Sequence, residues 1–214
     1  KKINKIKLIQ NKALELSLFL SIPATIALII GSEQIISALF GYGSFDETSV
    51  TNSSLALHYF ALGLPAFAFI KVFSSFFFAN HDTKTPFYIS LISVLLNIFI
   101  SLYYFNEVGF IIIPIATSIS SWFNSILLFI FLKNLNLFSF NKIFFVNFVK
   151  IIIASIIMGL LFNFLLIFFQ DELLFNHNIK SLYLILIVIL ALLFYLFICY
   201  FIKAFKMSDI KLKY

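Results

Sequence analysis

The sequence predicts an all-α, polytopic membrane protein with six transmembrane helices. Composition is the first observation behind this prediction, because the chain is 62% hydrophobic and only 11% charged. A soluble domain has about 45–50% apolar and about 25% charged residues. A soluble fold of 214 residues would therefore lack the polar side chains needed to cover its surface. The second observation is that apolar runs of spanning length recur along the chain, and a spanning helix needs roughly 20 such residues.

The apolar runs define the expected helices and the turns between them. None shows the period-2 alternation of a strand, and an open sheet edge in lipid would leave backbone groups unpaired. The breaks between the runs are rich in glycine, asparagine and acidic residues, which favour turns. The six expected helices are Ala13–Ile30, Leu55–Ala79, Phe87–Phe105, Phe110–Leu132, Phe145–Phe169 and Leu182–Ile202.

Ser32–Phe40 is too short to span a membrane. Two interpretations stay open for it. The segment forms either a short amphipathic helix at the outer surface or a continuation of the first helix beyond Gly31.

The charges predict the orientation of the helices. All 15 cationic residues are lysines, and cationic residues favour the cytoplasmic side of a membrane. With six crossings, every lysine except Lys71 and Lys180 lies on one side, together with both ends of the chain. The loops on the opposite side combine Lys180 with acidic residues. We therefore expect both termini in the cytoplasm.

Catalytic and nucleic-acid-binding patterns are absent from the sequence. The three histidines and the single cysteine have no metal-ligand spacing, and no glycine-rich phosphate loop occurs. The lysines flank apolar runs instead of forming patches with interleaved aromatic residues. We expect a protein that is not an enzyme, that has no catalytic cofactor and that binds no nucleic acid.

Polar side chains form stripes on two neighbouring helices of the predicted bundle. Residues three to four apart share one face of a helix. Such stripes arise either from close packing of helices or from a polar cavity or ion site between them. The first stripe is Ser90, Ser93, Asn97 and Ser101, and the second is Thr117, Ser120, Ser121 and Asn124.

Lys71 is a charged residue well inside an expected helix. It precedes Ala79 by eight residues, which is about 12 Å along a helix. The lysine either extends toward the cytoplasmic interface or faces an aqueous cavity that receives an anionic headgroup. Pro65 lies upstream and should kink the same helix, because proline lacks a backbone N–H. Lys71, Asn97 and Asn124 are our candidate substrate or cavity residues.

Several motifs in this order resemble the lipid II flippase family MurJ/MviN, of the multidrug/oligosaccharidyl-lipid/polysaccharide exporter superfamily. Leu57–Pro86 resembles the family's glycine- and proline-containing helix with an internal lysine, followed by its D-T-K-T-P loop. Leu39–Phe45 and Val108–Leu128 resemble a second loop and a later helix of the family. The residues that match the first motif are Gly63, Leu64, Pro65, Lys71, Ala79, Asp82, Thr83, Lys84, Thr85 and Pro86.

The resemblance implies a fold and a function. The family fold has fourteen helices in two lobes, and residues 1–214 look like its carboxy-terminal portion, helices nine to fourteen, so that the amino-terminal lobe is missing. The implied function is to flip lipid II, the undecaprenyl-diphosphate-linked peptidoglycan precursor, across the bacterial inner membrane by alternating access. The implied partners are lipid II, membrane lipids and the other lobe. The last two helices would line a hydrophobic groove for the lipid tail.

The resemblance also implies sites. Some family members bind sodium in this lobe, and Asn97, Ser101 and Thr117 occupy the matching positions. Ser101 stands where the family has a carboxylate, so we expect at most a weak sodium site and leave coupling to Na⁺ or to the membrane potential open.

The matching loop Asp82–Pro86 has a physical role of its own. Asp82 can cap the following helix, and Pro86 suits its first turn.

Two alternative functions remain at this level. One is export of another polyprenyl-linked glycan or a drug by a related transporter. The other is a non-transporting membrane scaffold in cell-wall assembly, which would tolerate leucine at the polar positions of the two striped helices.

Overall fold

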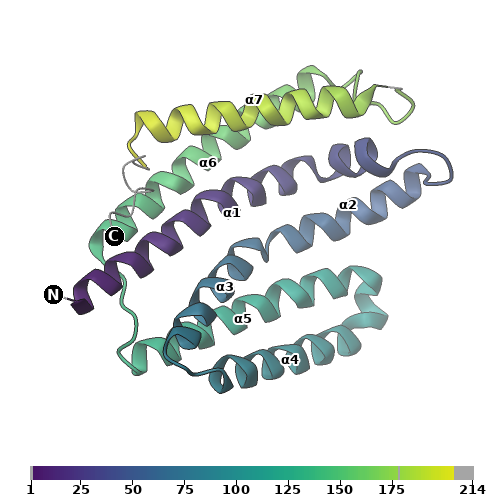
Figure 1. Ribbon diagram of the computed structural model, residues 1–214. Helices are drawn as coiled ribbons and strands as arrows, with labels where there is room; N and C mark the ends of the chain where they lie inside the picture. Colours follow the sequence, from purple (N-terminus) through teal and green to yellow (C-terminus); the bar gives the residue numbers. More distant parts are fainter. Residues whose placement is uncertain (1, 178, 205–214) are drawn as a thin grey trace. The chain divides into compact units, whose positions relative to one another are not determined.

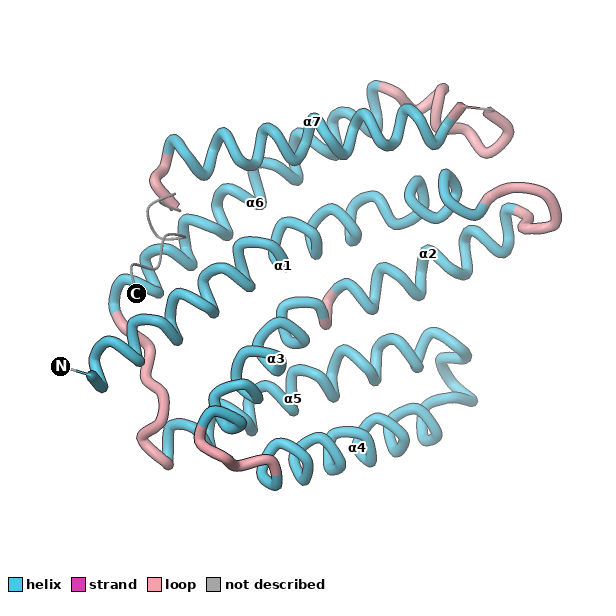
Figure 2. Tube along the Cα trace, in the orientation of Figure 1, coloured by secondary structure: helices cyan, strands magenta, loops and turns pink. Residues whose placement is uncertain are grey.

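The structure is a computed structural model that describes residues 2–177 and 179–204, and this part of the chain is helical without strands (Figures 1 and 2). Lys1, Lys206, Lys211 and Lys213, which contributed to the orientation argument, lie outside the described residues. The helices are α1 (Lys2–Phe40), α2 (Glu47–Ala61), α3 (Leu64–Ala79), α4 (Lys84–Val108), α5 (Ile112–Asn134), α6 (Lys142–Phe168) and α7 (Lys180–Phe201).

Four helical segments are long and apolar enough to cross a membrane, or five if the bent pair α2–α3 counts as one. One of these segments, Lys84–Asn134, has 51 residues and contains both α4 and α5. A straight helix of that length would measure about 77 Å, whereas the bilayer core is about 30 Å thick. The chain turns at Gly109, whose φ of +73° suits glycine, and α4 and α5 run back along each other (Figure 1). The six apolar runs of the sequence therefore lie in α1, the α2–α3 pair, α4, α5, α6 and α7.

Helix α1 settles the two interpretations of Ser32–Phe40. The segment is helical and continues α1, but Gly31 interrupts the helix with φ −108° and ψ 19°. Gly31 is also a site of close packing, because a Cβ there would lie 2.7 Å from Cε1 of Phe162. The segment thus continues the first helix beyond Gly31, as the second interpretation expected.

The chain forms two compact units. The first contains the residues up to Ser21 and Tyr59–Phe144, and the second contains Ile22–His58 and the described residues from Phe145 onward.

In the first unit, the loop after α5 folds under an aromatic cluster. Phe138 is 2% exposed, and its ring stacks on that of Phe76 and meets those of Phe73 and Phe140 edge to face. The start of α1 holds this loop, since the Asn11 amide donates to the Ser139 carbonyl at 3.0 Å and accepts from the Asn141 N–H at 3.1 Å.

In the second unit, α1 packs on α6 at small residues. A Cβ at Gly159 would lie 2.5 Å from Cγ2 of Ile26, so only glycine allows the two helices to approach this closely.

Lys180 ties two loops of the second unit to the start of α7. Its side chain is 1% exposed, and Nζ donates to the carbonyls of Gly41 at 2.8 Å and Phe175 at 2.6 Å. The ammonium also lies 4.5 Å from the ring centroids of Tyr42 and Phe175. Sequence reasoning saw Lys180 only as an exception to the lysine pattern, whereas in the fold it is a buried structural cation.

We predict that Lys180→Met lowers the stability of the protein. The substitution leaves two carbonyls without their charged donor, and such hydrogen bonds are worth about 1.5–3 kcal/mol each. The measurement is the temperature at which the detergent-solubilised protein unfolds. Lys142→Met, at an exposed lysine at the start of α6, is the matched control. Equal melting temperatures for the two variants would contradict the role of Lys180.

Candidate functional site

The two predicted polar stripes face each other in the first unit. The Asn97 amide on α4 donates to the Thr117 hydroxyl at 3.0 Å and to the Ser120 hydroxyl at 3.3 Å, both on α5. Further along, the Asn124 amide donates to the Ser90 hydroxyl at 3.4 Å. We call this contact the α4–α5 seam. Its hydrogen bonds join the two helices in an environment where water does not compete for polar groups.

Two oxygen atoms of the seam are buried without a hydrogen-bond partner among the described residues. They are Oδ1 of Asn124 and Oγ of Ser101. Other hydroxyls of the two stripes form hydrogen bonds within their own helices. Thr117 donates to the Ile113 carbonyl at 2.8 Å, and Ser93 donates to the Ile89 carbonyl at 2.8 Å. The seam is therefore a packed, hydrogen-bonded contact that retains two unused acceptors.

The positions matched to the family's sodium site lie around this contact. Asn97 and Thr117 are in direct contact, and Ser101 lies one turn further along α4. These residues offer only neutral oxygen atoms. In the described part of the chain, no group of three or more histidine, cysteine, aspartate or glutamate residues is placed to hold a metal ion.

The break between α2 and α3 lies beside α5. The two helices meet at a bend of 43°, two residues before Pro65, and this agrees with the predicted kink. Inside a membrane each freed carbonyl needs a new donor. The Ser118 hydroxyl donates to the Tyr59 carbonyl at 2.6 Å, and the Trp122 indole N–H donates to the Leu62 carbonyl at 3.0 Å. Side chains of α5 thus stabilise the break.

Sequence reasoning missed the roles of Ser118 and Trp122. Gly63 and Pro65 did signal a break, and a break in lipid requires donors from elsewhere. Nothing in the linear sequence says which helix supplies them. The close approach depends on Gly63, where a Cβ would lie 3.1 Å from the Ser118 hydroxyl and 3.2 Å from the Ser121 hydroxyl.

Lys71 lies on α3 with an exposed side chain. Within the described residues it makes no hydrogen bond or ion pair, and so it is not joined to Asn97 or Asn124. Of the three candidate cavity residues, the structure places the two asparagines in one seam and leaves the lysine outside it.

The Asp82–Pro86 loop starts α4. Oδ1 of Asp82 accepts the Thr85 backbone N–H at 3.0 Å, and the buried Pro86 lies in the first turn of the helix. Hydrogen bonds from the Thr85 side chain, and then from its backbone N–H, hold the pKa of the Asp82 carboxyl below its ordinary value of 3.8. Thr83 and Lys84 are exposed in this loop. The expected cap is present, so the loop has a structural role at the helix start.

Repeated apolar helices, a broken helix satisfied by its neighbour and a polar seam within the bundle define a multi-pass membrane protein. The family model for the lipid II flippase MurJ matches residues 1–184. The chain therefore belongs to the lipid II flippase MurJ family.

Individual relatives agree with this assignment. The chain is 41% identical over 116 residues to the probable lipid II flippase MurJ of Rickettsia prowazekii, covering 54% of the chain and 23% of the relative. It is 33% identical over 162 residues to that of Buchnera aphidicola subsp. Acyrthosiphon pisum, covering 72% of the chain and 31% of the relative. The chain thus spans less than a third of the length of these curated relatives.

A solved structure titled lipid II flippase MurJ, inward closed conformation, has the same fold. It superposes with a TM-score of 0.75 at 25% sequence identity, over 94% of this chain and 40% of the solved chain.

We predict that Ser118→Ala destabilises the first unit more than Ser121→Ala. The first change leaves the Tyr59 carbonyl at the break without its donor, which costs about 1–3 kcal/mol when the group is buried. The second removes only a bond to the Ser118 carbonyl within α5 itself. Thermal unfolding of the purified variants measures the difference. Indistinguishable unfolding temperatures would show that α5 does not stabilise the break.

We further predict that Asp82→Asn folds with a small loss of stability, because an amide oxygen also accepts the Thr85 N–H but lacks the charge, whereas Asp82→Ala is less stable still. The folded pKa of Asp82 is lowered, so its ionised form contributes stability above the unfolded pKa. That contribution is lost as the pH falls below about 4. Unfolding temperatures of the wild type and Asp82→Ala, compared at pH 7 and pH 3, should converge at the lower pH. A gap that stays constant would contradict the assignment.

Proposed function

We propose that this chain forms part of a transporter that flips lipid II from the inner to the outer leaflet of the bacterial inner membrane. The observation that carries the proposal is the family match over residues 1–184. The fold shared with a solved lipid II flippase supports it. We also propose that both ends of the chain face the cytoplasm, as the lysine pattern favours. On this proposal the protein is a transporter and not an enzyme.

The α2–α3 break is suited to a moving part. Alternating access requires helices that change their bend or tilt. Two side-chain hydrogen bonds, from Ser118 and Trp122, hold the Tyr59 and Leu62 carbonyls just before Gly63. When the bend changes, the Tyr59 and Leu62 carbonyls exchange their side-chain donors. The backbone hydrogen bonds within α2 and α3 stay intact. The seam beside it joins α4 to α5, so these two helices would move together.

Lys71 would attract the anionic diphosphate of the substrate. Its exposed side chain offers three donors as a point charge, and the chain has no arginine to grip phosphate in a bidentate manner. We propose that the other lobe of the same protein supplies the remaining headgroup contacts. The nearly uniform apolar residues of α7 would face the lipid tail or the membrane lipids.

We expect the natural gene product that contains this sequence to sustain growth of a bacterium whose own lipid II flippase is depleted. Lys71→Gln should reduce transport of lipid II to the outer leaflet by about tenfold, the effect of losing one charged contact to phosphate. Transport is measured by the accessibility of labelled lipid II to an external enzyme. Lys133→Gln, at an exposed lysine at the end of α5, is the control. A protein that reaches the membrane and moves another polyprenyl-linked lipid, but not lipid II, would favour the related exporter.

We also propose a weak Na⁺ site at Asn97, Ser101 and Thr117. The contact between Asn97 and Thr117 and the unused Ser101 hydroxyl support it. Transport should then fall when Na⁺ is replaced by choline, and the Na⁺ concentration for half-maximal transport should rise in Thr117→Val. Transport that is indifferent to Na⁺ would contradict the proposed site.

A further inference from the structure

The carbonyls just before the α2–α3 break have two possible sets of hydrogen-bond donors. Leu62 and Gly63 separate the two helices (Figure 2), and side chains of α5 donate to the carbonyls of Tyr59 and Leu62. In an unbroken helix, each carbonyl accepts from the backbone N–H four residues later. For these two carbonyls, those donors are the N–H groups of Gly63 and Ala66. Neither residue is a proline, so both donors exist.

Both backbone donors lie close to where a straight helix needs them. The Gly63 N–H donates to the Phe60 carbonyl at 3.0 Å, three residues back, so a shift by one carbonyl would bring it to Tyr59. Ala66 is buried in the first turn of α3, where backbone N–H groups have no acceptor in their own helix. A straight form would give its N–H the carbonyl of Leu62.

Pro65 brings the bent and the straight forms closer in free energy. It lacks the N–H that the Ala61 carbonyl, four residues earlier, would need in a straight helix. The straight form therefore misses one backbone hydrogen bond at this point. An ordinary helix without the proline would favour the straight form more strongly.

The two side-chain donors of the bent form differ in how freely they can move. Ser118 is 6% exposed, and its hydroxyl lies only 3.1 Å from the place of a Cβ at Gly63, so it is closely packed. Trp122 is 39% exposed, and together with Leu62 it lines an apolar cleft of about 600 Å³ beside the break. The cleft leaves room for the indole and the Leu62 carbonyl to separate. The Trp122 hydrogen bond is therefore the one that can be released first.

We propose that the α2–α3 break is a two-state switch that Trp122 holds in its bent form. In the bent form, Ser118 and Trp122 donate to the two carbonyls, and in the straight form Gly63 and Ala66 donate instead. Because each form satisfies both carbonyls, the bend can change inside the membrane without leaving them unpaired. The indole N–H loses its acceptor in the straight form, so the bent form is favoured at rest.

The use of this switch in alternating access rests on the proposed function, but its two forms can be measured without transport. The test uses the natural gene product in lipid, with spin labels at Thr48 and Ala79 and no other reactive cysteine. These exposed residues lie near the far ends of α2 and α3. Straightening the 43° bend should lengthen the distance between the labels by about 3 Å.

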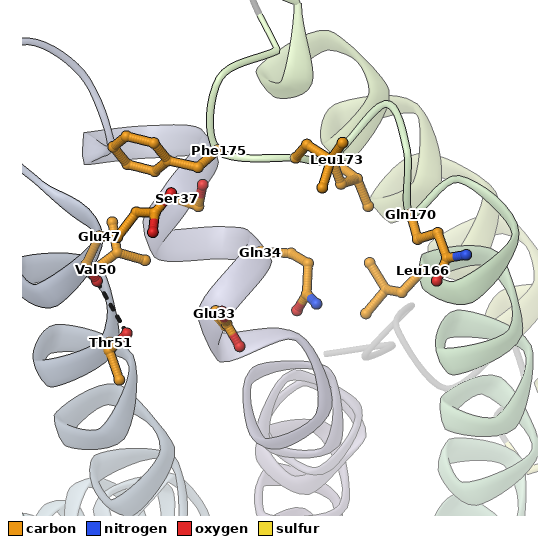
Figure 3. A pocket seen from close by; sticks show the side chains of 11 residues that line it. Glu33, Gln34, Ser37, Glu47, Val50, Thr51, Leu166, Gln170, Leu173 and Phe175 are labelled. Carbon is orange, nitrogen blue, oxygen red and sulfur yellow. Dashed lines mark hydrogen bonds between the residues drawn. The ribbon is translucent and has the colours of Figure 1, made fainter.

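Trp122→Phe keeps an aromatic ring but removes the N–H donor of the bent form. The ratio of the straight to the bent form should rise about tenfold, the effect of losing one hydrogen bond. Thr51→Val is the matched control on α2. The Thr51 hydroxyl donates to the Glu47 carbonyl of its own helix at 2.9 Å (Figure 3, dashed line), away from the break. The control should have the wild-type distance.

Pro65→Ala is the second variant, because it supplies the N–H that the Ala61 carbonyl lacks. It should also favour the longer distance, and the signal of a fluorine label on the Trp122 indole should shift as the indole is released. Wild-type distances in both variants, with wild-type melting temperatures, would overturn the switch. Lengthening in Pro65→Ala without a shift of the fluorine signal would overturn the role of Trp122. Two distances in a protein that flips no lipid II would refute the proposed function alone.

Discussion

The need to satisfy every backbone polar group without water governs this structure. Helices do so internally except where they break, and the chain breaks its helices at Gly31, at Leu62–Gly63 and at Gly109. At the α2–α3 break, the freed carbonyls of Tyr59 and Leu62 are covered by two side chains of α5. In the second unit, the buried ammonium of Lys180 covers two loop carbonyls.

The same constraint explains why polar residues gather at so few places. A polar side chain on a spanning helix must find a partner on its own or on a neighbouring helix. The α4–α5 seam meets this demand through Asn97, Thr117 and Ser120, and through Asn124 and Ser90. The demand is not fully met at Ser101 and at Oδ1 of Asn124, which have no hydrogen-bond partner among the described residues.

Small residues set the distances between helices in both units. Gly63 allows two serine hydroxyls of α5 to lie close to its backbone, and Gly159 allows Ile26 of α1 to do so. Close approach brings backbone carbonyls within reach of short side chains such as serine. The residues that satisfy the break are thus available because glycine removes the Cβ that would hold them away.

By itself, the sequence determined the helical membrane class, the kink near Pro65 and the cap at Asp82, because hydropathy, proline chemistry and capping act over a few neighbouring residues. It also predicted the two polar stripes, since helical periodicity is local. Only the tertiary structure decided that Ser118 and Trp122 donate to the carbonyls at the α2–α3 break and that Lys180 is buried. These contacts join residues 59, 60 and 139 positions apart in the chain, and a local pattern carries no information about which distant segment becomes a neighbour.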